Sequence, residues 1–333
     1  KKGMKLLLAS FRTAKGSWRT LFRIRVWVAP VTAAVALVVA VMAVLLVTNV
    51  TIAQERGQYI PGFRGLNPAE MPHAGFSYFN FFYYYPTSTL KDRDGNKANT
   101  DFDLDLVADL NLFAYTPKKK FLGATYSALI AVPVMNAAIT LPRLGADMST
   151  GASFGDVYIE PISLGWALKK GKGRIRAAYG FMPPSGARRV TSDYFGHQVS
   201  FGGTYHPDKH GLWQISGHSV WEFHHKKRNS DVTVGNNVTF EYGVGKTFVK
   251  NKGAQIYQLG VVGYSQFQMT QDSGADVIPF NVGAKDRVFA VGPEFDAIFP
   301  KSKVNLFVRV LPEFGARSRT QGVTLMMGIG KTF

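Results

Sequence analysis

The 333-residue sequence predicts an all-β protein, a transmembrane antiparallel β-barrel of the outer-membrane type. Three observations support this fold class. From residue 74 onward, short segments alternate apolar and polar residues, which is the period of β-strands. Many of these segments reach the roughly ten residues that a tilted strand needs to cross a bilayer. Short and long connections also alternate along the chain, as they do in barrels with short periplasmic turns and long external loops.

The alternation defines about 12 strands, an even number as in bacterial outer-membrane barrels. The clearest segment is 101–114, in which every even position is apolar and the odd positions carry four aspartates. Closure of such a sheet leaves no unpaired edge in the lipid. We predict strands at 74–85, 101–115, 121–134, 154–168, 173–183, 196–207, 211–225, 237–249, 254–268, 287–299, 302–314 and 322–333.

The connections between these strands fall into two classes, which we assign to the two ends of the barrel. Because the strand number is even, both ends of the barrel domain are expected on the side of the short turns, which is the periplasm. The short turns are 117–120, 169–173, 207–211, 249–253 and 300–303. The long loops are 86–100, 135–153, 184–195, 226–236, 269–286 and the somewhat shorter 315–321.

The N-terminal region differs from the rest of the chain. Residues 1–25 hold eight Lys or Arg and no acid, and 27–50 hold no charged residue. A basic region followed by an apolar run indicates a secretory signal peptide ending near Ala53, with a retained membrane anchor as the alternative. Residues 54–73 are then a periplasmic tail or a plug in the lumen, and 74–333 form the barrel.

Composition excludes several classes of function. The chain has no cysteine, so a disulfide framework, a thiolate nucleophile and a Cys-ligated metal site are all absent. The net charge of +17 comes partly from the basic leader, so we expect no nucleic-acid partner. The sequence indicates no cofactor.

The C-terminal phrase "MGIGKTF" imitates a phosphate-binding loop. A true loop of that kind needs glycine at position 325, where leucine stands, and a following helix, for which only Phe333 remains. The phrase is therefore read as the interfacial end of a strand. The terminal Phe333 resembles the aromatic signal that the barrel assembly machinery reads in outer-membrane proteins.

Two segments, "HAGFSYFNFFYYY" (73–85) and "FGDVYIEPISLGW" (154–166), resemble the outer-membrane β-barrel family associated with the meta-pathway of phenol degradation. The most specific piece is Gly155-Asp156-Val157-Tyr158 with Pro161 and Leu164-Gly165-Trp166. Members are described as transporters of aromatic or other hydrophobic compounds. The resemblance thus implies a channel for hydrophobic molecules, and it runs over most of 60–333.

Polar residues on the polar face of each strand are candidates for a lumen lining or substrate pathway, because barrels usually turn their apolar face to lipid. The aspartates of the 101–114 segment form either a solvated wall paired with arginines or a cation-selective stripe. Asp156 and Glu160 form either a structural charge network or a gate or ligand-binding group. The full set is Asp101, Asp103, Asp105, Asp109, Asp156, Glu160, Arg174, Arg176, His218, Glu222, Glu241 and Arg309.

Catalytic and metal sites are not predicted. His218, Glu222 and His224 share one face of a strand, but their spacing along it does not suit a single metal ion. Serines and seven histidines are present, yet no pattern marks a nucleophile. We therefore expect a non-enzymatic channel in a Gram-negative outer membrane, for passive uptake of small hydrophobic or aromatic molecules. Its partners are outer-membrane lipid, the assembly machinery and that substrate. The alternatives are a small general porin, an outer-membrane lipid-modifying enzyme and a purely structural barrel.

Overall fold

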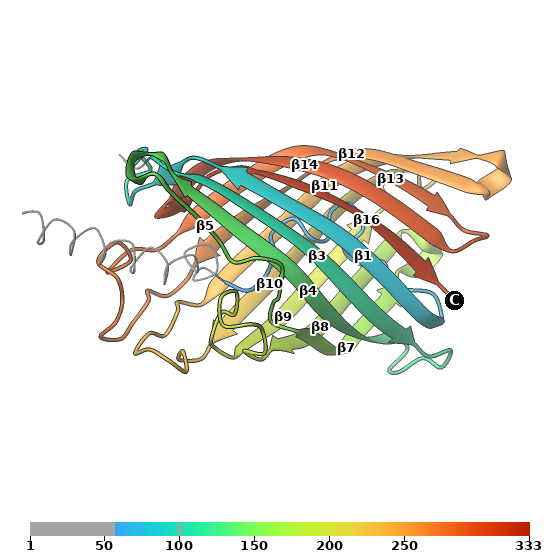
Figure 1. Ribbon diagram of the computed structural model, residues 1–333. Helices are drawn as coiled ribbons and strands as arrows, with labels where there is room; N and C mark the ends of the chain where they lie inside the picture. Colours follow the sequence, from blue (N-terminus) through green and yellow to red (C-terminus); the bar gives the residue numbers. More distant parts are fainter. Residues whose placement is uncertain (1–56, 99–100) are drawn as a thin grey trace, which may run out of the picture. The chain divides into compact units, whose positions relative to one another are not determined.

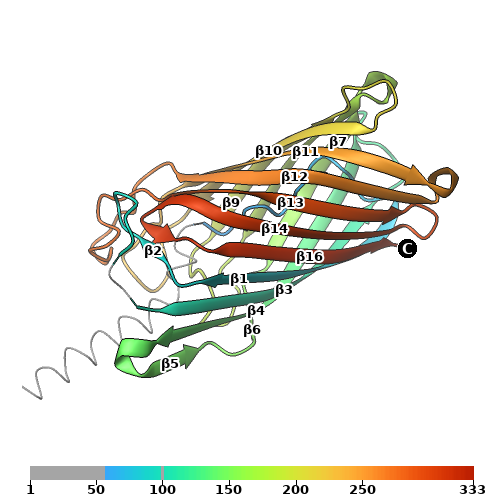
Figure 2. The same ribbon diagram turned by 90° about the horizontal axis from the view of Figure 1, so that it is seen from above.

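The computed structural model describes residues 57–98 and 101–333, so the predicted leader lies outside the described residues. Within them, twelve long strands form one closed antiparallel barrel, which confirms the predicted fold class (Figures 1 and 2). The long strands are β1 (Gly75–Thr87), β3 (Asp103–Thr116), β4 (Thr125–Leu141), β7 (Tyr158–Ala167), β8 (Gly173–Met182), β9 (Gly196–Tyr205), β10 (Trp213–His224), β11 (Asn237–Lys250), β12 (Gln255–Gln268), β13 (Arg287–Phe299), β14 (Val304–Arg317) and β16 (Val323–Thr332).

Closure joins the first strand to the last. β1 pairs with β16 from Ser77↔Thr332 to Tyr84↔Leu325, and β1 also pairs with β3 along its whole length. Every other long strand pairs with its neighbours in the chain, so the topology is a simple up-and-down meander. Most backbone groups of the long strands therefore find partners within the barrel wall, which is what a bilayer favours.

Short strands and 3-10 turns lie in the connections at the two ends of the barrel. Among the described residues, no helix is both long and apolar enough to cross a membrane. The short strands are β2 (Leu90–Lys91), β5 (Ala146–Ser149), β6 (Ser153–Phe154) and β15 (Arg319–Thr320), and the 3-10 turns are η2 (Pro142–Leu144), η3 (Lys169–Gly171) and η4 (Asn251–Gly253).

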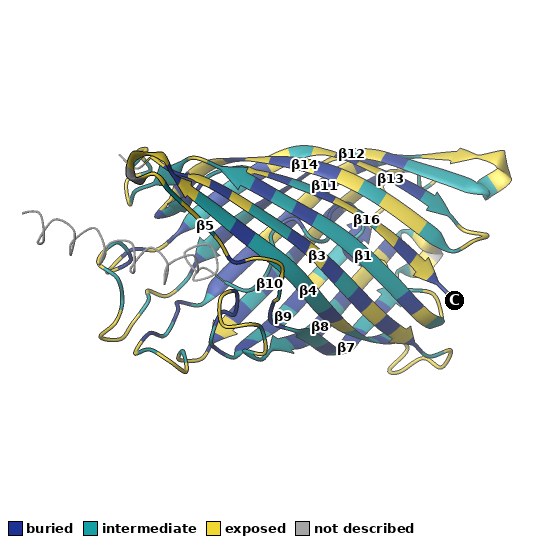
Figure 3. Cartoon of the chain, viewed as in Figure 1, coloured by how far each residue is buried: buried dark blue, intermediate teal, exposed yellow. Residues whose placement is uncertain are grey.

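Along most strands buried residues alternate with more exposed ones (Figure 3), as expected when successive side chains point to opposite faces. On most strands the outer side chains are apolar and exposed, for example Val244, Val261, Val308 and Met327. Inner side chains of β10 and β11 are buried and mostly polar. This pattern is the one expected of a barrel with a lipid-facing belt.

One stretch of the wall departs from the prediction. β4 extends to Leu141, well beyond the predicted end at residue 134, because its upper half continues to pair with β3 as far as Asp103↔Thr140. On its other edge, β4 pairs with β7 only over Thr125–Ala131. Beyond Ala131, toward the long-loop end, β4 pairs on this edge only with the short strands β5 and β6. The β4–β7 seam is therefore the least continuous part of the wall.

Candidate functional site

The lumen is occupied by residues 57–72, which we call the plug. Figure 1 shows this segment as a blue trace inside the barrel. The plug forms neither helix nor strand. Leu66 and Ala69 are fully buried, and Leu66 packs in one core cluster with Val262, Tyr264 and Leu311 of the wall.

Three carboxylates of the wall hold the plug through its backbone. Glu222 Oε1 accepts hydrogen bonds from the backbone N–H of Gln58 and Tyr59, at 2.7 and 2.8 Å. Glu294 Oε1 accepts one from Leu66 at 3.0 Å. An irregular buried segment has no ladder to satisfy its N–H groups, so these acceptors replace secondary structure. Hydrogen bonds to a charged partner are also the stronger kind.

Glu241 is the central anchor. Its Oε1 accepts from the backbone N–H of Gly62 at 2.8 Å and of Phe63 at 3.1 Å, and from the Tyr59 hydroxyl at 2.7 Å. Its Oε2 accepts from the backbone N–H of Arg64 at 2.9 Å. Successive backbone N–H groups that converge on one anion form a nest, and here the carboxylate of Glu241 is that anion.

Glycine is required where the plug bends around its anchors. Gly62 has φ +84° and Gly65 has φ +54°, both in the left-handed region. A Cβ on Gly62 would lie 2.5 Å from Leu311 Cδ1, and one on Gly65 would overlap Glu294 and Arg309. Both the backbone conformation and the close approach therefore exclude larger residues.

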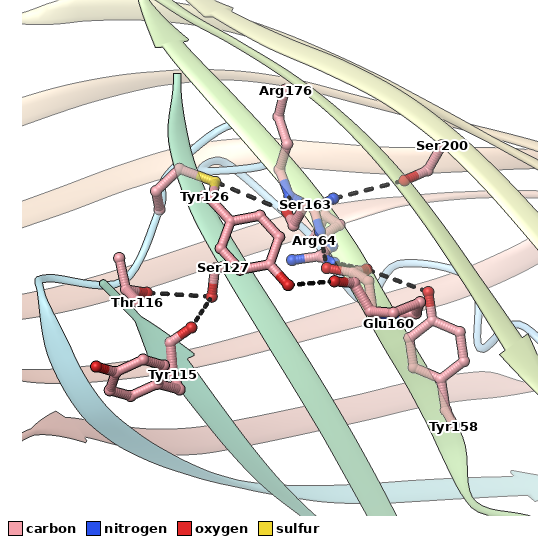
Figure 4. Close-up of polar contacts among 12 residues, drawn as sticks. Arg64, Tyr115, Thr116, Tyr126, Ser127, Tyr158, Glu160, Ser163, Arg176 and Ser200 are labelled. Carbon is pink, nitrogen blue, oxygen red and sulfur yellow. Dashed lines mark hydrogen bonds and ion pairs between the residues drawn. The ribbon is translucent and has the colours of Figure 1, made fainter. Parts of the chain in front are cut away.

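A buried ion cluster lies between the plug and the wall (Figure 4). Glu160 of β7 forms an ion pair and hydrogen bond with Arg176 of β8, and its Oε2 lies 3.5 Å from Arg64 of the plug. The Tyr158 hydroxyl donates to the same oxygen at 3.1 Å, and Arg176 Nε donates to Ser163 at 2.8 Å. The side chains of Glu160 and Arg176 are only 2% and 3% exposed. Each charge is therefore stabilised by the other, because water cannot solvate it.

A second buried ion pair joins β13 and β14. Arg309 Nε is 3.1 Å from Glu294 Oε2, and its guanidinium carbon lies 4.4 Å from the ring centroid of Phe307. Arg309 also donates to the carbonyl of Gly62. Glu294 was not among the predicted lumen residues, although its alternation with Phe289, Val291 and Phe295 in 287–299 is a signal for an inward carboxylate.

The lumen is more acidic than basic. The strand residues β7–β14 contribute six buried carboxylates and two buried guanidinium groups among those that the structure describes. The six backbone N–H groups of the plug and Arg64 offset part of this excess. The carboxylates are Glu160, Glu222, Glu241, Glu294, Asp296 and Glu313, and the arginines are Arg176 and Arg309.

A cavity of about 600 Å³ remains beside the plug. Residues of the short turns, including Gly171, Gly211 and Lys303, line its mouth, so it opens toward the end predicted to be periplasmic. One side of the cavity is apolar. On this side the ring of Phe63, from the plug, packs against the ring of Phe81, from β1, with centroids 4.8 Å apart. The apolar lining of this side includes Phe63, Phe79, Phe81, Leu112, Leu129 and Phe307.

The opposite side of the cavity is polar and ties the plug at the mouth. Glu70 forms an ion pair with Arg174 of β8. Asn67 donates to Gln258 at 2.7 Å and to Asp296 at 3.3 Å. The cavity is thus amphipathic: aromatic rings face one way, and paired polar groups face the other.

The placement of the aspartates on β3 corrects the sequence prediction. Asp103, Asp105 and Asp109 are exposed on the outer face, whereas the alternate residues Leu110 and Leu112 are buried. Those leucines pack in one cluster with Ile60 and Phe63 of the plug, besides other wall residues. The expectation that the polar face of each strand lines the lumen was wrong for β3. The plug presents apolar side chains to this part of the lumen, so the apolar face of β3 turns inward.

The outward carboxylates are partnered on the surface. Asp105 accepts a hydrogen bond from the Tyr84 hydroxyl at 2.7 Å, and Asp109 accepts one from Asn80. Asp101, which precedes β3, lies 3.5 Å from Arg143 and is half exposed, so it too is outside the lumen. The wall face of β1 and β3 therefore carries a polar stripe among otherwise lipid-facing strands.

We expect the outward aspartates to leave permeation untouched. Replacing Asp103, Asp105 and Asp109 together with asparagine should leave the ion selectivity of single-channel currents within about twofold of wild type, because these carboxylates lie on the outer face, where salt screens their effect on ions inside the barrel. Reversal potentials in a salt gradient measure this directly. A clear loss of cation preference would place these carboxylates along the ion path after all.

The other predicted residues lie in several places. Glu160, Arg176, His218, Glu222, Glu241 and Arg309 are all buried on the inner face. Arg174 is at the mouth of the cavity with Glu70. Asp156 is buried but acts on a loop: its carboxylate accepts hydrogen bonds from Gly186, Thr191 and Ser192, which fix the 184–195 loop against the wall.

A solved outer-membrane channel has the same fold as this chain. An outer membrane channel from Pseudomonas putida F1 aligns with a TM-score of 0.62 and 13% identity, covering 83% of this chain and all of that one. The β-domain of the Bordetella autotransporter BrkA aligns with a TM-score of 0.47 and 13% identity, covering 78% of this chain and all of the domain. Comparison with the curated proteins finds no match. A family model described as "Putative MetA-pathway of phenol degradation" matches residues 87–328, which is most of the barrel, and the chain therefore belongs to that family.

Proposed function

We propose that this protein is an outer-membrane channel for passive uptake of small hydrophobic or aromatic compounds. The observation that carries the proposal is the amphipathic cavity beside the plug. Its volume of about 600 Å³ falls within the range of small-molecule pockets, and one side is lined with aromatic rings. The family to which the chain belongs is associated with degradation of phenol, an aromatic compound.

The plug disfavours the alternative of a general porin. Six backbone hydrogen bonds and two ion pairs tie residues 57–72 to the wall, so a water-filled path would need the plug to move. A hydrophobic solute has a different requirement, namely an apolar surface to follow. The lumen face of β1 and β3 supplies one.

Access from outside is proposed at the β4–β7 seam. Regular pairing of β4 with β7 ends at Ala131, and the upper part of the seam holds the β5–β6 segment and Gly155. A Cβ on Gly155 would lie 3.0 Å from Pro133 and Met135 of β4, so any larger residue at this position would narrow the seam further. A solute dissolved in the outer leaflet could reach the lumen here and leave through the cavity on the periplasmic side.

A pair of variants on one strand tests the function. Phe81 faces the cavity, whereas Phe82 faces outward on the same strand. Phe81→Gln should lower the uptake rate of radiolabelled toluene by whole cells by about tenfold, since it puts a polar group on the apolar path. Phe82→Gln should leave that rate unchanged.

The host must have an intact lipopolysaccharide layer, which is the barrier that the channel would bypass. Uptake no faster than in cells lacking the protein would overturn the proposal. Rapid swelling of proteoliposomes in sugar solutions would favour the general porin instead.

We also propose that the barrel assembly machinery recognises the C-terminal aromatic. Phe333 is 65% exposed. Its backbone N–H donates a hydrogen bond to the carbonyl of Phe76 at 2.9 Å, which holds the residue at the barrel rim. Deleting Phe333 should reduce the fraction of folded barrel in the outer membrane severalfold, measured by heat-modifiable migration on gels. Refolding of the same purified variant in detergent should be unaffected, since the deletion removes a signal and no core contact.

A further inference from the structure

Two histidines meet on the outer face at the long-loop end. His197 is the second residue of β9, and His225 follows the end of β10. Their Nε2 atoms are 3.2 Å apart. His224 is buried on the inner face, so its neighbour His225 points outward and away from the lumen.

The backbone fixes this approach. β10 pairs with β9 at Phe223↔His197, and the ladder continues beyond β10 because His225 N–H donates to the Phe195 carbonyl at 2.9 Å. His197 and His225 are therefore diagonal neighbours on one face of paired strands. Their separation is set by the ladder rather than by a free loop.

The distance between the nitrogens suits a shared metal ion. Two zinc–nitrogen bonds of about 2.0–2.1 Å in tetrahedral geometry place the nitrogens about 3.3 Å apart. A hydrogen bond between two neutral imidazoles gives a similar separation. The surroundings of the two rings favour the first reading.

The neighbouring side chains orient His197 as a ligand. The Tyr179 hydroxyl lies 2.8 Å from His197 Nδ1. When Nδ1 carries the proton and donates to Tyr179, the lone pair of Nε2 is free and points at His225. Metal-ligating histidines nearly always have such a partner on the other nitrogen.

Aromatic packing holds both rings in place. The centroid of Phe195 lies 4.9 Å from that of His197 and 5.6 Å from that of His225, and Phe181 stacks on Phe195 at 5.6 Å. Rings held in this way lose little freedom when they bind an ion, which is the main cost of a two-ligand site.

We propose that His197 and His225 bind one divalent transition-metal ion of the class that prefers imidazole, with Zn²⁺ as the chosen ion. In the described part of the chain, no group of three or more His, Cys, Asp or Glu residues could hold a metal, so water completes the coordination. Tyr179 is a positioning residue. This site lies outside the lumen and does not depend on the proposed uptake function.

Calorimetric titration of the untagged full-length protein with ZnCl₂ in detergent tests the site. We expect saturable binding of one ion, with the affinity reduced at least tenfold in His197→Gln and in His225→Gln. The double variant should bind no more weakly than either single one, because one imidazole alone retains little affinity. His210→Gln, in an exposed turn at the other end, is the matched control and should bind like wild type.

Two further measurements separate a metal site from a hydrogen-bonded pair. Electron paramagnetic resonance with CuCl₂ should show coupling to two nitrogens in wild type and to fewer in either variant. Tyr179→Phe should weaken zinc binding by about tenfold. Wild-type protein that binds no zinc stoichiometrically, or binding that His197→Gln leaves unchanged, would overturn the proposal. Heat-modifiable migration verifies that each variant is folded.

Discussion

Replacing Glu222 and Glu241 together with glutamine is expected to release the plug and raise single-channel conductance severalfold. Glu241 accepts four hydrogen bonds from the plug, three of them from backbone N–H groups. In glutamine an NH₂ group replaces one of the two carboxylate oxygens. This donor then faces the N–H of Arg64 or of Gly62, which is also a donor. Each hydrogen bond to a charged acceptor contributes about 1.5–3 kcal/mol, so the two changes together remove several kcal/mol of plug attachment.

The released lumen should prefer cations. The double variant still has four buried carboxylates on β7–β14 against two guanidinium groups. Deleting residues 57–72 keeps all six carboxylates and should give a stronger preference for cations. Conductance and reversal potentials in planar bilayers measure both effects.

The matched control also removes two carboxylates from the wall. Asp103→Asn with Asp105→Asn changes the net charge equally, but on the outer face, and should leave the current near wild type. If the Glu222/Glu241 variant conducts no more than this control, backbone capture by the carboxylates is not what holds the plug.

Replacing Glu160 with glutamine is expected to destabilise the barrel by about 3–5 kcal/mol, because removing one partner of a buried ion pair leaves the other charge uncompensated. Here two positive groups, Arg176 and Arg64, lose their shared carboxylate. Urea unfolding in detergent, followed by tryptophan fluorescence, measures the free energy of unfolding.

A double-mutant cycle isolates the pair from packing changes. Arg176→Met should destabilise less, since Arg64 still neutralises Glu160. The double variant should lose much less than the sum of the two single changes, because Arg176 is no longer left beside a missing carboxylate. Strictly additive losses would mean that Glu160 and Arg176 do not act as a pair.

The strand pattern was predictable because each strand obeys a local rule. The predicted strands 237–249 and 254–268 match β11 and β12 to within one residue at each end, and 287–299 matches β13 at both ends. Their alternation is uninterrupted and their turns contain Lys, Asn and Gly. β4 was predicted too short because its upper half, residues 135–141, reads as a mainly apolar loop until β3 is placed beside it.

The lumen was only partly predictable. Glu222 and Glu241 stand out as carboxylates opposite aromatic residues on their strands, and the structure places both inside. Nothing in the sequence indicates that their partners are backbone N–H groups of residues 58–64. These hydrogen bonds join residues about 160 to 180 positions apart in the chain, and a local sequence pattern cannot predict such a contact.

The sequence by itself determined the barrel, its strand number and the ends of most strands, since alternation and loop length are properties of neighbouring residues. Only the tertiary structure decided which face of β3 turns inward. Alternation separates two faces but does not say which one meets lipid, and a shift of one residue exchanges them. That choice depends on Ile60 and Phe63, which pack against the leucines of β3 from inside the lumen. The aspartates face outward because a distant segment fills the space that would otherwise be water.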